Sequence, residues 1–204
     1  MYKTTILLLC LSSLAGYGWT VSFDNGFTSD TGQDPVNTWQ AKKVDTGVTG
    51  PGVLLEKAGR LSYASKDESG AFIIAPVAGC VEFDFLPREP GTMIYAAFDS
   101  GNIRITGHGK GVQLNAVLAL NNGEKAKLVA PGGTIKIGEW NRVTLRYDLL
   151  KPKSQISLEV NGVVVAVATV TGTRLADGDD KFHWGVYGWG GNPWNGIYDN
   201  LKIE

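Results

Sequence analysis

The segment WNRVTLRYDLLKPKSQISLEVNGVVVAVATV, residues 140–170, decides the fold class. Apolar and polar residues alternate over residues 143–149 and 156–160, which is the period of β-strands with one buried face, and a mainly apolar arm, VVVAVATV (163–170), follows. The two residues between the arms, Asn161 and Gly162, are a strong signal of a tight β-hairpin because both tolerate positive φ angles. The segment therefore predicts two long antiparallel strands.

Shorter runs of the same kind fill the rest of the chain, and turn residues (Gly, Pro, Asn and Asp) separate them. The runs are WTVSFDNGF (19–27), VLLEKAGRLSYAS (53–65), AFIIAPV (71–77), VEFDFL (81–86), MIYAAFD (93–99), NIRITG (102–107), GVQLNAVLAL (111–120) and KAKLVA (125–130). No window has a helical period. The sequence predicts an all-β protein, an antiparallel β-sandwich with a jelly roll as the leading form.

The chain has 204 residues and a formal net charge of −1, which predicts one domain and no basic face for nucleic acid. Its first residues, MYKTTILLLCLSSLAG, combine one lysine, a short apolar run and small residues. This layout is typical of a secretory signal, so we expect a signal peptide at 1–18 and a single domain at 19–204. The mature protein would be secreted, extracellular or periplasmic, with no membrane association. Cys10 falls in the signal, which leaves Cys80 without a disulfide partner.

Three motifs near the C-terminus carry a family resemblance. GEWNRVTL (138–145) followed by YD (147–148) and LEVNGV (158–163) resembles a pair of strands common to the concanavalin A-like lectin and glucanase superfamily, laminin-G-like domains included. The ending GIYDNLKI (196–203) is similar to that superfamily's closing strand. The resemblance implies a jelly roll of the concanavalin A-like type. It leaves the function open, because lectins, hydrolases, lyases and adhesion modules share this fold.

An aromatic segment, FHWGVYGWGGNPWNGIY (182–198), suggests a sugar-binding surface. Strand alternation predicts that Trp184 and Tyr198 are in the core. Trp189 and Trp194 flank a Gly-Gly-Asn-Pro turn, so we expect them to be exposed platforms for sugar rings. The polar residues expected to bond with sugar hydroxyls are Asn192, Asn195, Asn115 and Gln113. The favoured hypothesis is a secreted carbohydrate-binding β-sandwich whose partner is a polysaccharide or other glycan.

A second resemblance leads to an alternative, a polysaccharide lyase acting on a uronic-acid polymer. FHWGVY (182–187) resembles the alginate-lyase strand that carries the proton-transfer tyrosine, which implies a catalytic role for Tyr187. QLN (113–115) matches the glutamine of a second motif of those enzymes but has asparagine where they have histidine. Elimination also needs two further groups: a base, and a group that neutralises the charge of the uronate carboxylate. The catalytic candidates are Tyr187, His183, Arg104 and Gln113, and whether the protein is an enzyme stays open.

Two further functions are weighed. Glu82 and Asp84 point the same way from VEFDFLP (81–87), as paired carboxylates of a glycoside hydrolase would. However, Pro87 stands where the laminarinase and lichenase branch has its second glutamate, and the ordinary interpretation is a solvated acidic strand face. Hydrolysis is therefore the less favoured enzymatic alternative. A laminin-G-like protein-interaction module is the third hypothesis.

A structural cation is expected from the two ends of the domain. Asp24 in FDNG (23–26) and Asp199 in YDN (198–200) resemble the paired acidic positions by which many jelly-roll modules hold Ca²⁺ between their terminal strands. Calcium takes six to eight oxygen ligands, so carbonyls of the turn at 46–50 would have to contribute. The alternative is that both acids are ordinary turn residues before asparagine. No other cofactor is implied.

Overall fold

The computed structural model describes residues 18–56, 59–88, 95–108, 113–150, 154–171, 173–185 and 196–204. Within them the chain forms strands and turns, with no helix long and apolar enough to cross a membrane. The strands are β1 (Trp19–Val21), β2 (Ala41–Val44), β3 (Gly52–Leu55), β4 (Arg60–Ala64), β5 (Ala78–Pro87), β6 (Tyr95–Asp99), β7 (Ile103–His108), β8 (Gln113–Ala119), β9 (Lys125–Val129), β10 (Asn141–Asp148), β11 (Ser154–Val160), β12 (Val163–Val170), β13 (Lys181–Gly185) and β14 (Gly196–Ile203). The predicted all-β class is confirmed.

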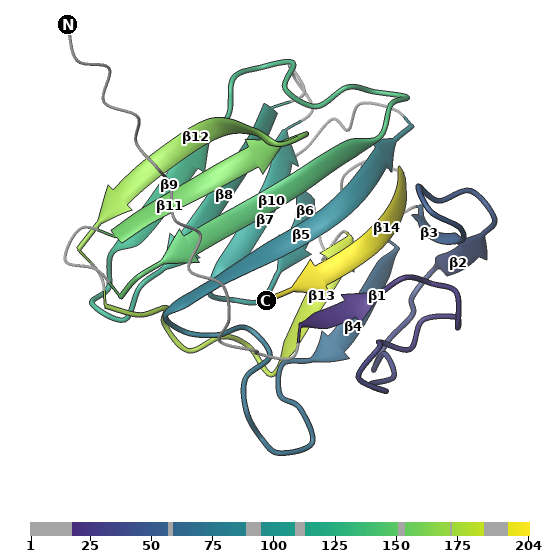
Figure 1. Cartoon of the computed structure of the whole chain (residues 1–204), viewed down its shortest axis with the longest axis horizontal. Coiled ribbons are helices and arrows are strands. Elements are labelled where there is room, and N and C mark those ends of the chain that lie inside the picture. The colour runs from purple at the N-terminus through teal and green to yellow at the C-terminus, as the bar shows by residue number, and fades with distance from the viewer. Residues whose placement is uncertain are drawn as a thin grey trace, which may run out of the picture.

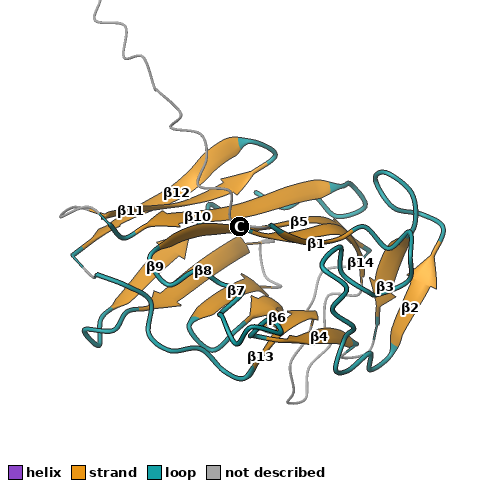
Figure 2. Ribbon diagram, turned by 60° about the horizontal axis from the view of Figure 1, so that its bottom comes forward, coloured by secondary structure: helices purple, strands orange, loops and turns teal. Residues whose placement is uncertain are grey.

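The strands form two antiparallel sheets that pack face to face (Figure 1 and Figure 2). The eight-stranded sheet has the order β12-β11-β10-β5-β14-β3-β2, with β1 also paired to β14. The six-stranded sheet has the order β4-β13-β6-β7-β8-β9. The first and last strands are neighbours, with Trp19 opposite Ile203. This arrangement is the expected antiparallel sandwich of concanavalin A-like, jelly-roll type.

The hairpin predicted from residues 140–170 is present in the eight-stranded sheet. Strands β11 and β12 meet at the pair Val160 and Val163, and β10 lies on the other side of β11. Asn161 and Gly162 have φ angles of 53° and 77°. Positive φ at both central residues is what a two-residue hairpin turn requires, since it matches the twist of the strands.

Aromatic side chains from both sheets fill the space between them. Trp184 of β13 lies with its ring centroid 5.3 Å from that of Phe83 on β5 and 4.6 Å from that of Phe98 on β6. Tyr198 of β14 lies 4.6 Å from Phe85. Trp184 and Tyr198 are 0% and 1% exposed, so the alternation rule placed both correctly in the core.

The strand expected over residues 71–77 is wrong, because this segment is a loop. Its backbone bonds to separate parts of the chain rather than to one neighbouring strand. The N–H of Ile73 donates to the carbonyl of Ser65, whereas the carbonyl of Pro76 accepts from the N–H of Leu175. Ile74 is nevertheless buried, which accounts for the strand-like composition of the segment.

The strand expected over residues 19–27 ends at Val21. Phe23 has a φ angle of 65°, which lies outside the β region and stops the extended chain. Its side chain turns into the core, and the N–H of Gly26 donates to its carbonyl to form a turn.

Replacing Trp184 tests the role of the aromatic core. We expect Trp184→Ala to lower the free energy of unfolding by about 3–5 kcal/mol, because it leaves a cavity between the sheets. Trp39→Ala, at a tryptophan that is 58% exposed, should change it by no more than about 0.5 kcal/mol. Denaturant unfolding followed by circular dichroism measures both, and equal losses would contradict this account of the core.

Candidate functional site

One face of the six-stranded sheet points away from the core and carries polar side chains. Because side chains alternate, the burial of Phe182 and Trp184 turns His183 outward. Strand pairing then aligns one row of outward residues across the sheet. From β4 to β9 the row consists of Ser62, His183, Asp99, Arg104, Val117 and Lys127. The structure thus brings the predicted site residues His183 and Arg104 onto the same face, with β6 between their strands.

Arg104 is held in this row by a carboxylate. Its Nε donates to Oδ2 of Asp99 at 2.8 Å, and the side chain of Asp99 is almost fully buried. The other oxygen of Asp99 accepts from the N–H of Gly101 at 3.0 Å. Arg104 itself is half exposed, so its remaining N–H groups face solvent. The pair gives the face a positioned cation.

His183 is fixed by the strand on its other side. Its Nδ1 lies 2.7 Å from the hydroxyl oxygen of Ser62, which is buried. Burial lowers the pKa of His183, and the positive charge of Arg60 lowers it further. The carboxylates of Asp99 and Asp179 act in the opposite direction but do not reverse the shift. His183 is therefore a neutral imidazole near neutral pH, which suits hydrogen bonding to hydroxyl groups.

A groove of about 470 Å³ runs along these two strands. Its lining residues are Val36, Asn37, Arg60, Ser62, Asp179, Asp180, Lys181 and His183. We call it the β4–β13 groove. Arg60 and Lys181 lie at opposite ends, because Lys181 pairs with Ala64, four residues along β4 from Arg60. At about 3.4 Å per residue these two positions are roughly 14 Å apart along the strands. The length of the groove therefore exceeds what one small polar group of a ligand would occupy.

A tryptophan that sequence reasoning missed lies beside the groove. Trp39 is 58% exposed, and its carbonyl accepts from the N–H of Arg60 at 2.8 Å. Its own N–H donates to Oδ1 of Asn37 at 2.8 Å. The backbone of Trp39 is thus tied to two residues that line the groove. The sequence could have indicated this exposure, because Trp39 lies in a polar, turn-rich segment where strand alternation does not predict a buried side chain.

The same face continues to β8, where Gln113 and Asn115 point outward because Leu114 and Ala116 are buried. The side-chain amide of Gln113 donates to the carbonyl of Ala130 at 3.0 Å. Oδ1 of Asn115 is buried and, among the described residues, has no hydrogen-bond partner. Such an atom is uncommon in a folded protein and is costly to leave unsatisfied.

The other predicted catalytic and sugar-binding residues lie outside the described part of the chain. They are Tyr187, Trp189, Asn192, Trp194 and Asn195. The predicted aromatic loop and the predicted catalytic tyrosine therefore stay predictions.

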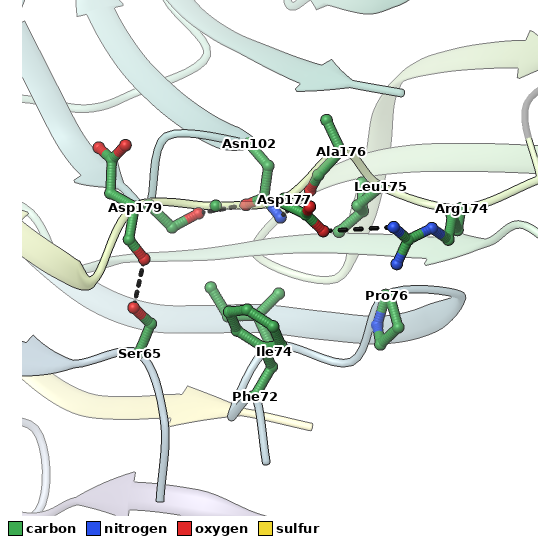
Figure 3. Close-up of a pocket in the computed structure, with 12 residues that line it drawn as sticks. Ser65, Phe72, Ile74, Pro76, Asn102, Arg174, Leu175, Ala176, Asp177 and Asp179 are labelled. Atoms are coloured by element: carbon green, nitrogen blue, oxygen red, sulfur yellow. Dashed lines mark hydrogen bonds and ion pairs between the residues drawn. The ribbon is translucent and has the colours of Figure 1, made fainter. Parts of the chain in front are cut away.

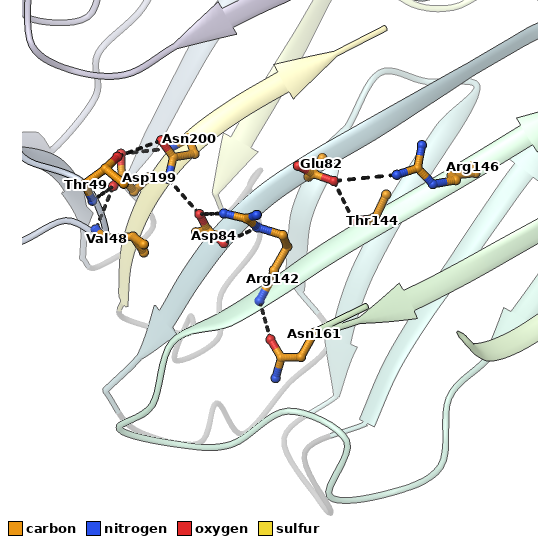
Figure 4. Close-up of polar contacts among 10 residues, drawn as sticks. All are labelled: Val48, Thr49, Glu82, Asp84, Arg142, Thr144, Arg146, Asn161, Asp199 and Asn200. Carbon is orange, nitrogen blue, oxygen red and sulfur yellow. Dashed lines mark hydrogen bonds and ion pairs between the residues drawn. The ribbon is translucent and has the colours of Figure 1, made fainter. Parts of the chain in front are cut away.

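Asp199, one of the two predicted calcium ligands, lies in β14 beside the turn at 46–51 and is fully buried. Its Oδ2 accepts from the N–H groups of Val48 and Thr49 at 2.7 and 3.3 Å (Figure 4). Its Oδ1 accepts from the N–H of Asn200 at 2.8 Å. Backbone donors thus compensate much of the cost of burying this carboxylate.

Oxygen atoms from three segments gather at the same turn. A Cβ added to Gly47 would lie 2.6 Å from Oδ2 of Asp199, 2.6 Å from the carbonyl of Gly50 and 2.7 Å from that of Pro51. A Cβ added to Gly50 would lie 3.3 Å from Oδ1 of Asp24. Both predicted acids therefore border the predicted turn, and the oxygen donors are of the type that Ca²⁺ prefers. Among the described residues, no three His, Cys, Asp or Glu side chains are placed so that they could hold one metal ion, so further ligands would be carbonyls or water.

The paired acids of β5 lie on the outer face of the eight-stranded sheet, where the expectation of a solvated acidic face is wrong for Asp84. Arg142 binds both oxygens of the buried Asp84, at 2.9 and 2.8 Å, and Asn200 donates to one of them at 2.7 Å (Figure 4). Glu82 accepts from the hydroxyl of Thr144 at 2.8 Å. Asp84 is thus fully engaged in a bidentate ion pair, a structural arrangement that leaves it no free oxygen to attack a sugar.

Comparison with known proteins gives a family and a set of similar folds. A family model described as the concanavalin A-like lectin/glucanases superfamily matches residues 80–204. None of the curated protein sequences matches this chain.

Similar solved structures include three toxin domains. The binding domain of Paraclostridial Mosquitocidal Protein 1 has a TM-score of 0.68 at 15% identity, over 85% of this chain and 44% of that one. The botulinum neurotoxin serotype G binding domain has a TM-score of 0.70 at 8% identity, over 91% of this chain and 47% of that one. The botulinum neurotoxin serotype D ligand-binding domain, in complex with N-acetylneuraminic acid, has a TM-score of 0.68 at 10% identity, over 91% of this chain and 46% of that one. This chain thus spans less than half of each domain, and identities this low show likeness of fold alone.

The lowered pKa of His183 has a consequence for stability. The unfolded chain binds a proton near the ordinary histidine pKa of about 6.5, whereas the folded protein binds it only at lower pH. The free energy of unfolding should therefore fall as the pH drops below about 6.5. In urea denaturation at about pH 7.5 and about pH 5.5, His183→Gln should lose less stability than the wild type. Equal losses in the two proteins would contradict the assignment.

Proposed function

The chain belongs to the concanavalin A-like lectin/glucanases superfamily, and we propose that it is a glycan-binding module that uses the β4–β13 groove. The observation that carries the proposal is the combination of a polar groove with an exposed tryptophan beside it. The tryptophan is Trp39, and the groove offers donors and acceptors from Asn37, Arg60 and Asp180. Sugars present hydroxyl groups on their edges and weakly polar faces, so they need both kinds of surface.

The charges of the groove suit a ligand rich in hydroxyl groups. Arg60 and Lys181 supply donors only, whereas the carboxylates of Asp179 and Asp180 supply acceptors. With His183 neutral, the formal charges of these four side chains cancel. The neighbouring face adds Arg104, whose side chain is half exposed. The complex of the similar serotype D domain with N-acetylneuraminic acid supports a glycan as the ligand.

We expect Trp39→Ala and Arg60→Ala each to weaken glycan binding about tenfold or more, since exposed aromatic and arginine side chains often dominate binding. Tryptophan fluorescence and calorimetric titration with uronic-acid polysaccharides, neutral glucans and sialylated oligosaccharides would measure this. Val167→Ala is the matched control, because Val167 is similarly exposed but lies on β12 of the other sheet. Unchanged affinity in both groove variants would refute the proposed site.

Polysaccharide lyase activity is the second candidate, favoured by the shared outward face of His183, Arg104, Gln113 and Asn115. In this reading Arg104 neutralises the uronate carboxylate and the neutral His183 accepts the proton next to it. The same titrations can be followed for the near-ultraviolet absorbance of an unsaturated product. A rise in absorbance that is lost in Tyr187→Phe or His183→Gln would establish an eliminase, whereas binding without any rise would exclude it.

We propose further that Ca²⁺ binds at the turn beside Asp24 and Asp199, and that the module is secreted, as the composition of residues 1–16 indicates. The ion would offset the negative charge of the two carboxylates and link the turn at 46–51 to β14. Its role would be structural, because Asp199 lies on β14 of the other sheet and neither Asp24 nor the turn at 46–51 lines the β4–β13 groove.

Calcium should therefore raise the thermal unfolding temperature, and a chelator should lower it, because binding to the folded state alone stabilises it. Asp24→Asn should abolish the calcium response while the protein still folds. Asp67→Asn is the control, since Asp67 is an exposed turn residue in another loop. An identical unfolding temperature with calcium and with chelator would rule the ion out.

A further inference from the structure

Figure 3 shows a second, smaller cavity, which has a volume of about 40 Å³ and adjoins the β4–β13 groove through a shared lining residue. Three loops form it, at residues 65–76, 100–102 and 174–179. The two hollows share Asp179, which lines both. The hydroxyl of Ser65 donates to the carbonyl of Asp179, and the N–H of Asp179 donates to the carbonyl of Ser100, so the junction is fixed.

Most of the cavity wall is apolar. The apolar lining residues are Phe72, Ile74, Pro76, Leu175 and Ala176. Lys66 lies over the ring of Phe72 at 4.8 Å from its centroid, which helps to hold this exposed side chain in place.

The polar groups in the wall already have partners. The hydroxyl of Ser100 donates to Oδ1 of Asn102 at 2.7 Å, and the amide of Asn102 donates to the carbonyl of Ala176 at 2.9 Å. A water molecule in a cavity needs two to four polar partners. The cavity is therefore better suited to an apolar group than to water or a hydroxyl.

The rim of the cavity offers one donor group and one acceptor group. Arg174 donates to a carboxylate oxygen of Asp177 at 3.2 Å, and both side chains are substantially exposed. A guanidinium has five N–H donors and a carboxylate about four acceptor positions, so one mutual bond leaves most of them available. An amide at the rim would find an acceptor for its N–H and a donor for its carbonyl.

The size of the cavity limits what can enter it. At about 40 Å³ the cavity has less than a tenth of the volume of the β4–β13 groove, which is about 470 Å³, so it suits a small group. A sugar ring is too large for it, whereas an acetyl group has only three non-hydrogen atoms. A methyl ether would fill less of the cavity and make no hydrogen bond to the rim. A hydroxymethyl group would bury its hydroxyl among polar side chains that already bond to each other.

We propose that this cavity receives the N-acetyl group of an acetamido sugar whose ring lies at the adjoining end of the β4–β13 groove. The methyl group contacts the apolar wall, and the amide meets Arg174 and Asp177 at the rim. The inference rests on the proposed glycan-binding function and narrows it to glycans that contain N-acetylated amino sugars.

Matched oligosaccharides that differ only in the acetamido group test the inference. The first pair is tetra-N-acetylchitotetraose and cellotetraose, and a second pair carries N-acetylgalactosamine or galactose at the same position. In calorimetric titration of the full-length mature protein, we expect the acetamido member of at least one pair to bind about tenfold more tightly than its hydroxyl counterpart. Phe72→Ala should remove this preference while leaving the affinity for the hydroxyl member unchanged. Phe72→Leu, which keeps an apolar wall, should restore part of it.

Two variants keep the result interpretable. Arg174→Gln, at the exposed rim, should reduce the preference without disturbing the fold, and Val167→Ala on β12 should have no effect. Equal binding of both members of every pair, unaltered by Phe72→Ala, would overturn the inference but leave glycan binding standing. Binding of none of the oligosaccharides or polysaccharides would overturn both.

Discussion

The packing of Trp184 between the two sheets is the contact on which the rest of the structure depends. Its ring meets Phe83 of one sheet and Phe98 of the other, so it joins the layers as well as filling the space between them. The side-chain period of a strand is two, so the inward direction of Phe182 and Trp184 dictates the outward direction of His183. A shift of one residue in β13 would place a histidine in the core and a tryptophan in the groove. The core and the polar face are thus set by the same register.

The two acids at the centre of the eight-stranded sheet show how the fold tolerates like charges. Asp84 and Asp199 are opposite each other on paired strands, where like charges destabilise a sheet. Each has its own compensation, since Arg142 binds Asp84 and backbone N–H groups bind Asp199. Asn200 serves both, because its side chain donates to Asp84 and its backbone donates to Asp199. Its φ angle of 50° at a bulge in β14 allows this double contact.

Sequence reasoning succeeded where the evidence is local. Alternation identified the buried faces of β10, β11 and β13, and Asn161-Gly162 identified the hairpin, because these signals act over a few residues. It failed at residues 71–77, where the apolar composition reflects burial of Ile74 beneath a loop rather than strand pairing. It also misjudged Asp84, whose partner Arg142 is 58 positions away in the sequence. His183 and Arg104 were found as site candidates, but Trp39 was missed, because its place beside Arg60 depends on a pairing between distant segments.

One wall of the β4–β13 groove is formed by Val36 and Asn37, which belong to a loop that bonds to the edge of β4. Asn37 and Ser62 form a single β-bridge, and the segment contributes no regular strand. Loops accept insertions and substitutions more readily than the strands beneath them. The opposite wall, on β13, is constrained by the core. Exchange of this one short surface segment would therefore change the shape and polarity of the groove while the sandwich stays unchanged.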